Sequence, residues 1–144
     1  IMLPTDGSRL SGKAIKQGLA LARSIGAKVT AINVVPEYQM TIDEGLVLPA
    51  SMMIKKRFEQ ETTRRSKAIL AAVQSAALAA GVACDAVTTS SGRPYEAIIK
   101  HAKKARCDLI VMASHGRKGL SGILLGSETA KVLTHSRIPV LAVR

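Results

Sequence analysis

A glycine-rich segment in the last third of the chain, SHGRKGLSGILLGSE, carries the residue types that hold phosphate groups. It runs from Ser114 to Glu128, contains four glycines, and includes Arg117 and Lys118 as cations. Phosphate-binding loops need glycine because several backbone N–H groups must approach the oxygens closely, and side chains would block that approach. The segment therefore predicts an anion site built largely from backbone amides.

The same segment leads into a helix that we predict to begin at Ser127. The first N–H groups of a helix have no partners inside it, and the helix dipole favours an anion there. Ser127 can cap this helix or donate its hydroxyl to a phosphate. Two common nucleotide fingerprints are absent, because no lysine follows Gly126 and no GxGxxG occurs. A surface loop that only turns the chain, with Ser127 as an ordinary N-cap, is the alternative that remains open.

Three side chains, two near expected strand ends and one at the expected start of the last helix, can contact a ligand. Asp6 can accept hydrogen bonds from ribose hydroxyls or an adenine amino group, and its alternative role is to cap the first helix. His115 can touch a phosphate or assist a proton transfer, although a loop histidine without an acid or base partner is typically structural. Glu128 is adequately explained as a carboxylate at a favourable helix N-terminus.

These residues need elements to position them, and strands and helices alternate along the chain. Residues 37–49 show neither a strand nor a helix period, so we leave their conformation open. Short apolar strands without a polar face predict a mostly parallel sheet with helices on both sides, which binds ligands beyond the carboxyl ends of its strands. We predict strands over residues 1–5, 28–35, 82–92, 107–114 and 138–144, and helices over 8–25, 51–80, from 94, and over 127–135.

Length, charge and composition limit the class of protein. The 144 residues, 47% of them hydrophobic, fit one globular domain over residues 1–144. The net charge of +11 can attract nucleic acid, anionic lipid or nucleotide phosphates, but aromatic residues at 2% offer little for bases to stack on. We therefore rank specific nucleic-acid binding last, and we interpret the basic face of the second helix as solvated surface.

Several features point to a cytoplasmic protein without membrane contact. No apolar run is long enough for a membrane span, and the first residues, IMLPTDGS, lack the charged start and apolar core of a signal peptide. Cys84 and Cys107 form no CxxC pair, so we expect reduced thiols and no structural metal site.

Runs along almost the whole chain resemble the universal stress protein family. They are IMLPTDGS, VTAINVV, GRPYEAIIKHAKKARCDLIVMASHG and GILLGSETAKVLTHSRIPVLAVR. The resemblance implies a single three-layer α/β/α domain with a five-stranded parallel sheet, Rossmann-like and similar to the adenine nucleotide alpha hydrolases. It also implies ATP binding, which the family's nucleotide-binding branch achieves through backbone amides in a pattern written G-x2-G-x9-G-[S/T].

The family pattern matches this chain at its second and third glycines but not at its first. Gly116, nine further residues and Gly126-Ser127 complete it, whereas Ala113 stands where the first glycine is expected. A methyl group there would clash if that position needed positive φ or a close approach to the ligand. The resemblance places the first strand's end beside the adenine and ribose. The expected nucleotide site comprises Pro4, Thr5, Asp6, Val34, Met112, Ala113, His115, Gly116, Gly126, Ser127 and Glu128.

We expect an ATP-binding regulatory protein of the stress response rather than an enzyme, with ATP accompanied by Mg²⁺ or Mn²⁺. Hydrolysis needs a positioned water, a metal and a charge stabiliser, and only Asp6 and Glu128 offer carboxylates, so any ATPase activity should be slow. The alternative is a nucleotide-independent dimeric interaction module, in which Ala113 in place of the first glycine prevents nucleotide binding.

The last apolar strand, IPVLAVR, bears on assembly. An apolar strand at a sheet edge exposes unpaired backbone groups, and a symmetric dimer that joins two such edges removes that exposure. The resemblance implies a homodimer with Val140, Leu141 and Val143 in or near the interface. The alternative is that a helix covers this strand and that Val140 and Val143 fill the core of one chain.

Overall fold

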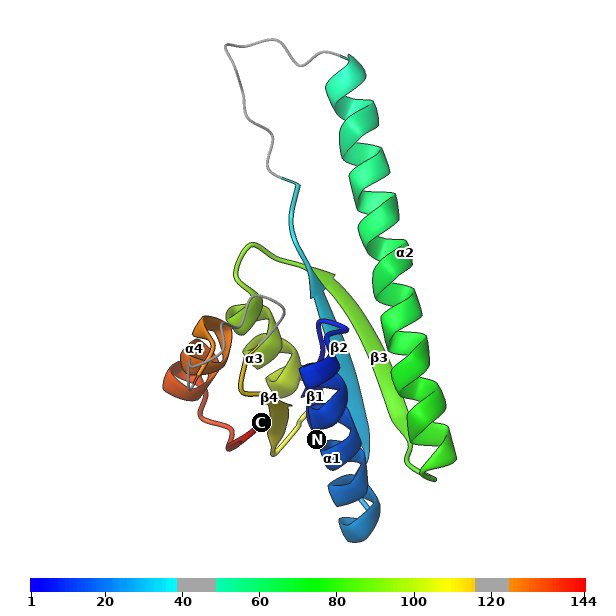
Figure 1. Cartoon of the computed structure of the whole chain (residues 1–144). Coiled ribbons are helices and arrows are strands. Elements are labelled where there is room, and N and C mark those ends of the chain that lie inside the picture. Colours follow the sequence, from blue (N-terminus) through cyan, green and yellow to red (C-terminus); the bar gives the residue numbers. More distant parts are fainter. Residues whose placement is uncertain (39–48, 116–124) are drawn as a thin grey trace.

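The computed structural model describes residues 1–38, 49–115 and 125–144, and its five strands form one parallel sheet. The strand order is β3-β2-β1-β4-β5, so β1 and β4 are neighbours at the centre (Figure 1). This arrangement confirms the predicted parallel α/β sheet. The strands are β1 (Met2–Pro4), β2 (Val29–Val35), β3 (Cys84–Ser90), β4 (Ile110–Ala113) and β5 (Val140–Val143).

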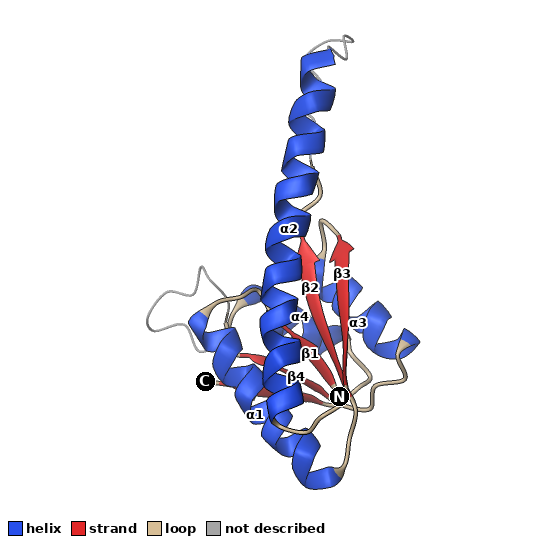
Figure 2. Ribbon diagram, turned by 90° about the vertical axis from the view of Figure 1, so that its right-hand side faces the viewer, coloured by secondary structure: helices blue, strands red, loops and turns tan. Residues whose placement is uncertain are grey.

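Four helices cover the sheet and produce the expected three layers (Figure 2). Helices α1 (Arg9–Ile25) and α2 (Pro49–Ala79) contact one face, and α3 (Pro94–Lys104) and α4 (Ser127–His135) contact the other. The core is correspondingly divided into two clusters of buried side chains, one on each face. Because α1 follows β1 on one face of the sheet and α4 follows β4 on the other, the connections after these two neighbouring strands leave the sheet in opposite directions.

Helix α1 begins and ends where local chemistry satisfies its free backbone groups. Ser8 is the N-cap, and its side chain accepts a hydrogen bond from the N–H of Ser11 at 3.1 Å. Gly26 ends the helix with a left-handed φ of 67° and donates its N–H to Ala22. The alternative role of Asp6 as the cap of this helix is therefore wrong. Asp6 instead accepts the N–H of Ser8 at 2.9 Å and shapes the turn before the helix.

Helix α2 is 31 residues long, and its amino-terminal half extends beyond the sheet (Figures 1 and 2). Its carboxyl-terminal half packs on the sheet through buried Leu70, Val73 and Ala77. Near its start, Met53 and Ile54 are 71% and 57% exposed. The helical spacing of Ile54 with Phe58, Ile69 and Val73 predicts that all of them lie on one buried stripe. For Ile54 this prediction is wrong, because the sheet does not reach that level of the helix.

The two cysteines are free thiols of intermediate exposure. Burial is the main reason that the pKa of the Cys84 thiol is raised, which favours its neutral form. Within the described ranges, no helix combines the length and the apolar character needed to cross a bilayer.

Candidate functional site

A cavity of about 810 Å³ opens at the carboxyl ends of the central strands. The ends of β1, β2 and β4 form its floor, and residues from α2, α3 and α4 form its walls. Such a crevice arises where adjacent parallel strands send their connections to opposite faces, as β1 and β4 do here. Its volume lies within the range of pockets that bind small molecules and cofactors.

The cavity brings together most of the residues predicted from the sequence. They come from three strand ends and from the start of α4, although up to 124 positions, from Pro4 to Glu128, separate them along the chain. Gly116, the remaining predicted residue, lies outside the described residues. The cavity is lined by ten predicted residues: Pro4, Thr5, Asp6, Val34, Met112, Ala113, His115, Gly126, Ser127 and Glu128.

Buried hydrogen bonds hold the end of β1 in place beside β2. The N–H of Thr5 donates to the carbonyl of Ile32 at 2.9 Å, and Asn33 Nδ2 donates to the carbonyl of Thr5 at 2.6 Å. Asn33 is buried and was not among the predicted site residues, although an asparagine within an apolar strand is the signal that would have found it. These bonds position the next residue, Asp6, at the cavity edge.

The start of α4 presents backbone N–H groups that no side chain caps. Gly126 is the N-cap, with a φ of −72° and no side-chain hydrogen bond to the helix. Ser127 is consequently the first helical residue, so its expected alternative role as the N-cap is wrong. Both residues line the cavity, and Ser127 is exposed. A helix start of this kind provides N–H donors and a favourable dipole for an anion.

Gly126 is required by a close approach of two backbone segments. Its N–H donates to the carbonyl of Ser114 at 2.7 Å. A Cβ atom added at this glycine would lie 2.9 Å from the Cα atom of His115. Since its φ is negative, the reason for glycine is space and not a left-handed conformation. The glycine therefore lets α4 start directly beside the end of β4.

Ala113 occupies ordinary strand geometry despite standing where the family pattern has glycine. It pairs with Val143 in the sheet, is 8% exposed and belongs to the core cluster on the α1 side. In the described part of the chain, Arg106 is the only non-glycine residue with positive φ. Ala113 therefore does not have the positive φ at which its methyl group would clash. Its carbonyl also accepts a buried hydrogen bond from Thr129 Oγ1 at 2.9 Å, which fastens α4 to β4.

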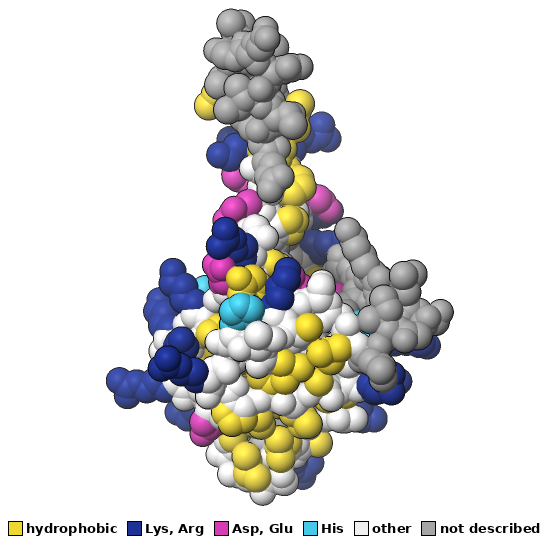
Figure 3. All heavy atoms as spheres, turned by 90° about the vertical axis from the view of Figure 1, so that its left-hand side faces the viewer, with side chains coloured by type: hydrophobic (Ala, Val, Ile, Leu, Met, Phe, Trp, Pro, Cys, Tyr) yellow, Lys and Arg dark blue, Asp and Glu magenta, His cyan; other side chains and the backbone are white. Residues whose placement is uncertain are grey.

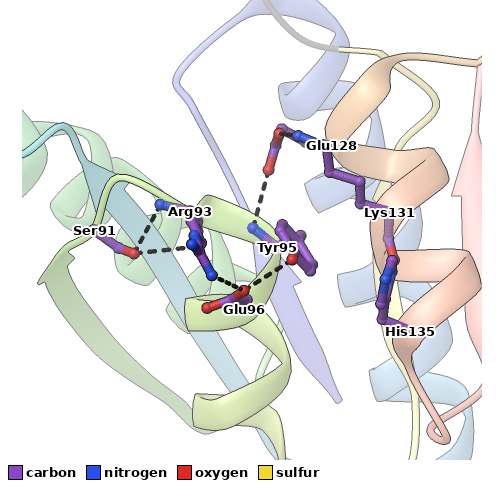
Figure 4. A network of polar contacts seen from close by, with 7 residues as sticks. All are labelled: Ser91, Arg93, Tyr95, Glu96, Glu128, Lys131 and His135. Carbon is purple, nitrogen blue, oxygen red and sulfur yellow. Dashed lines mark hydrogen bonds and ion pairs between the residues drawn. The ribbon is translucent and has the colours of Figure 1, made fainter.

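Glu128 links the two helices on one face of the sheet (Figure 4). Its Oε2 accepts the backbone N–H of Tyr95 at 3.0 Å, and its Oε1 accepts a hydrogen bond from Lys131 at 2.8 Å. The N-cap of α3, Arg93, makes no side-chain cap, so Glu128 caps α3 from the neighbouring helix. Its favourable place at the start of its own helix is thus only part of its role.

A polar and aromatic group at the start of α3 surrounds this link. The Tyr95 hydroxyl donates to Glu96 at 2.8 Å, and the Lys131 ammonium lies 5.5 Å from the centre of the Tyr95 ring. The hydrogen bond from Tyr95, followed by that from Arg93, lowers the pKa of the Glu96 carboxyl. The contribution of Glu96 to the stability of the fold is therefore present above the ordinary pKa of a glutamate carboxyl. It is lost as the pH falls through the lowered pKa of Glu96 in the folded state.

We expect Glu128→Ala to destabilise the fold by about 1 kcal/mol, because it removes the cap of α3. The free energy of unfolding, measured by urea denaturation, tests this. Glu128→Gln is the matched control, since its amide oxygen can still accept the Tyr95 N–H and the exposed ion pair that it loses contributes little. Equal losses in both variants would show that the ion pair, and not the cap, stabilises this link.

Helix α2 contributes a cavity wall that sequence reasoning missed. Thr62, Arg65, Ser66 and Ile69 line the cavity from this helix. The buried Ser66 hydroxyl lies 2.8 Å from Thr88 Oγ1, which fixes this part of α2 against β3. The sequence interpretation of the basic face as solvated surface omitted this contact with the cavity. No local signal marks it, because the wall depends on where α2 crosses the sheet.

Comparisons with known proteins agree on one family. The model of the universal stress protein family matches residues 1–144. Universal stress protein MJ0531 of Methanocaldococcus jannaschii is 33% identical over 147 residues, covering all of this chain and 81% of the relative. Universal stress protein YxiE of Bacillus subtilis is 31% identical over 146 residues, covering all of this chain and 97% of the relative.

Solved structures show the same fold. The structure of the hypothetical protein MJ0577 superimposes with a TM-score of 0.84 at 27% identity, covering 99% of this chain and 92% of that one. A universal stress protein in complex with cAMP gives a TM-score of 0.67 at 25% identity, with coverage of 99% and 94%. One from Archaeoglobus fulgidus in complex with dAMP gives 0.67 at 19% identity, with coverage of 99% and 95%.

Proposed function

Because the chain belongs to the universal stress protein family, we propose that its cavity binds an adenine nucleotide, with ATP as the ligand of a regulatory protein of the stress response. The observation that carries the proposal is the uncapped start of α4 at Gly126 and Ser127, which opens onto a cavity of suitable size. Related structures in complex with cAMP and dAMP support nucleotide binding in the family.

The cavity divides into surfaces that suit the parts of an adenine nucleotide. Val34, Ile98 and Met112 supply apolar surface for a base. Asp6 at the end of β1 supplies a carboxylate for ribose hydroxyls or the adenine amino group. Phosphates then lie at the start of α4, where N–H groups and the helix dipole favour negative charge.

A divalent cation fits this site chiefly as a companion of the phosphates. Mg²⁺ keeps several waters and usually takes one or two carboxylates together with phosphate oxygens. Both Glu128 oxygens already accept hydrogen bonds from protein donors, from Tyr95 and Lys131. Within the described residues no group of three or more histidine, cysteine or acidic side chains is placed to hold a metal ion. Bound Mg²⁺ would neutralise charge on the phosphates.

We propose binding without efficient turnover, so that nucleotide occupancy is the signal. His115 lines the cavity with its Nδ1 3.0 Å from the Ser114 hydroxyl, and this contact is consistent with a structural role.

A cytoplasmic location is supported by the two free cysteines, which are typical of reducing compartments.

The test is isothermal titration of the nucleotide-stripped protein with ATP, ADP, AMP and GTP, each with and without Mg²⁺. Saturable heat with adenine nucleotides, and weaker heat with GTP, is the expected result. Absence of heat at millimolar ATP would overturn the proposal and would favour the interaction module that needs no nucleotide. Phosphate release under the same conditions measures turnover, which we expect to be slow.

A homodimer through β5 is part of this proposal. Strand β5 lies at the edge of the sheet, and Leu141 on it is 43% exposed. Val143 is 3% exposed and belongs to the core cluster on the face covered by α1 and α2. Val140 is partly buried against the core cluster on the face covered by α3 and α4. Figure 3 shows grouped hydrophobic side chains on the side of the molecule where α4 lies. Leu133 on α4 is an exposed hydrophobic residue. Of the three predicted interface residues, Leu141 is thus the best placed to meet a second chain.

Leu141→Asp should convert the dimer to a monomer, because two carboxylates would face each other across paired edges. Sedimentation equilibrium measures the mass, with thermal unfolding as a check that the exposed substitution leaves the fold intact. A wild-type chain that is monomeric at all concentrations, or a variant that stays dimeric, would refute an interface at this strand.

A further inference from the structure

Arg65 is a positively charged residue on the cavity wall. Among the lining residues that the structure describes, it is the only lysine or arginine. It extends from α2, whereas Ser127 and the uncapped N–H groups belong to α4 on the opposite face of the sheet. A ligand in the cavity therefore has a cation on one wall and a helix start on another.

Two carboxylates, those of Asp6 and Glu128, line the cavity together with Arg65. Within the described ranges no acidic side chain forms an ion pair with it, although its neighbour Arg64 pairs with Glu61 at 3.1 Å. The Glu128 carboxylate at the cavity pairs with Lys131. Arg65 itself is an exposed residue of the cavity wall. An arginine in this position suits an anionic group, because its planar guanidinium can donate two parallel hydrogen bonds.

We propose that Arg65 binds the phosphate chain of the nucleotide, so that negative charge is held from α2 as well as from α4. The inference rests on the proposed function and adds a contact that lies outside the glycine pattern. It predicts that affinity rises with the number of phosphates, because each further negative charge is attracted by the cation that α2 places on the cavity wall. Arg65 thereby helps the site to prefer ATP over AMP and adenosine.

Arg65→Ala should weaken ATP binding about tenfold, as expected for the loss of a charge-assisted hydrogen bond. It should weaken AMP binding less and should leave adenosine affinity within about twofold, because a nucleoside has no phosphate for Arg65 to bind. Arg64→Ala is the matched control, since it removes an adjacent exposed arginine that does not line the cavity. Arg65→Lys should retain part of the affinity, since it keeps the charge but loses the planar fork. Titration calorimetry with all three ligands measures these affinities.

The outcomes separate this inference from the proposed function. Equal losses for adenosine and ATP would place Arg65 at the base or ribose and would overturn the phosphate contact. Equal ATP affinities in Arg65→Ala and Arg64→Ala would also overturn the phosphate contact of Arg65. The proposed function would still stand in that case, provided that the wild-type chain binds ATP. Failure of the wild-type chain to bind any adenine nucleotide would overturn both.

Discussion

Ser127→Asp should strongly weaken ATP binding without weakening the fold. Ser127 is exposed, lines the cavity and is the first residue of α4. An aspartate in the first turn of a helix interacts favourably with the helix dipole, so stability should stay equal or rise by up to about 1 kcal/mol. The same carboxylate would repel phosphates a few ångströms away, and this repulsion should weaken binding about a hundredfold or more.

Ser127→Asn is the matched control, because asparagine has the shape of aspartate but no charge. It should bind ATP far more tightly than Ser127→Asp does, and calorimetry on both variants gives the ratio. Thermal unfolding should show both variants folded at the titration temperature. Similar ATP affinities for the two variants would mean that the phosphates do not lie at the start of α4, and the proposed placement of the ligand would be wrong.

Gly126→Ala should damage both the fold and the site. The new Cβ atom would lie 2.9 Å from the Cα atom of His115, which is backbone and cannot rotate away. Helix α4 must then move away from the end of β4, and overpacking of this kind typically costs about 1–3 kcal/mol. The shift also displaces the N–H donors of the first turn, so ATP binding should fall more than tenfold.

Gly12→Ala provides the comparison for this glycine. A Cβ atom at Gly12 would meet nothing within 4 Å, and the residue lies in the first turns of α1. Alanine there should stabilise the fold by up to about 1 kcal/mol, because glycine is a poor helix former. Urea denaturation gives both changes in the free energy of unfolding. If Gly126→Ala were as stable as the wild-type chain, the start of α4 could move away from the end of β4 without loss of stability, and this prediction would be wrong.

Much of the fold could be predicted from the sequence because its signals are local. The run from Lys28 to Val35 is apolar on both faces, which is typical of a central parallel strand, and β2 occupies most of it. Gly26 ends α1 as a glycine C-cap predicts. The carboxyl ends of parallel strands share one edge of the sheet, so Asp6 and His115 were expected to lie near each other, and both line the cavity.

The remaining features depend on which elements become neighbours, and only the tertiary structure decides that. Glu128 caps α3 because α4 packs beside it, and Arg65 reaches the cavity because α2 crosses the sheet at that level. Ile54 is exposed because α2 is longer than the sheet that it covers. By itself the sequence determined the alternation of strands and helices, since that alternation follows from local backbone and side-chain properties. The tertiary structure decided why position 126 must be glycine, because it brings the backbone of His115 beside it. The packing of distant segments decided what surrounds the cavity, because those contacts join residues that no local pattern relates.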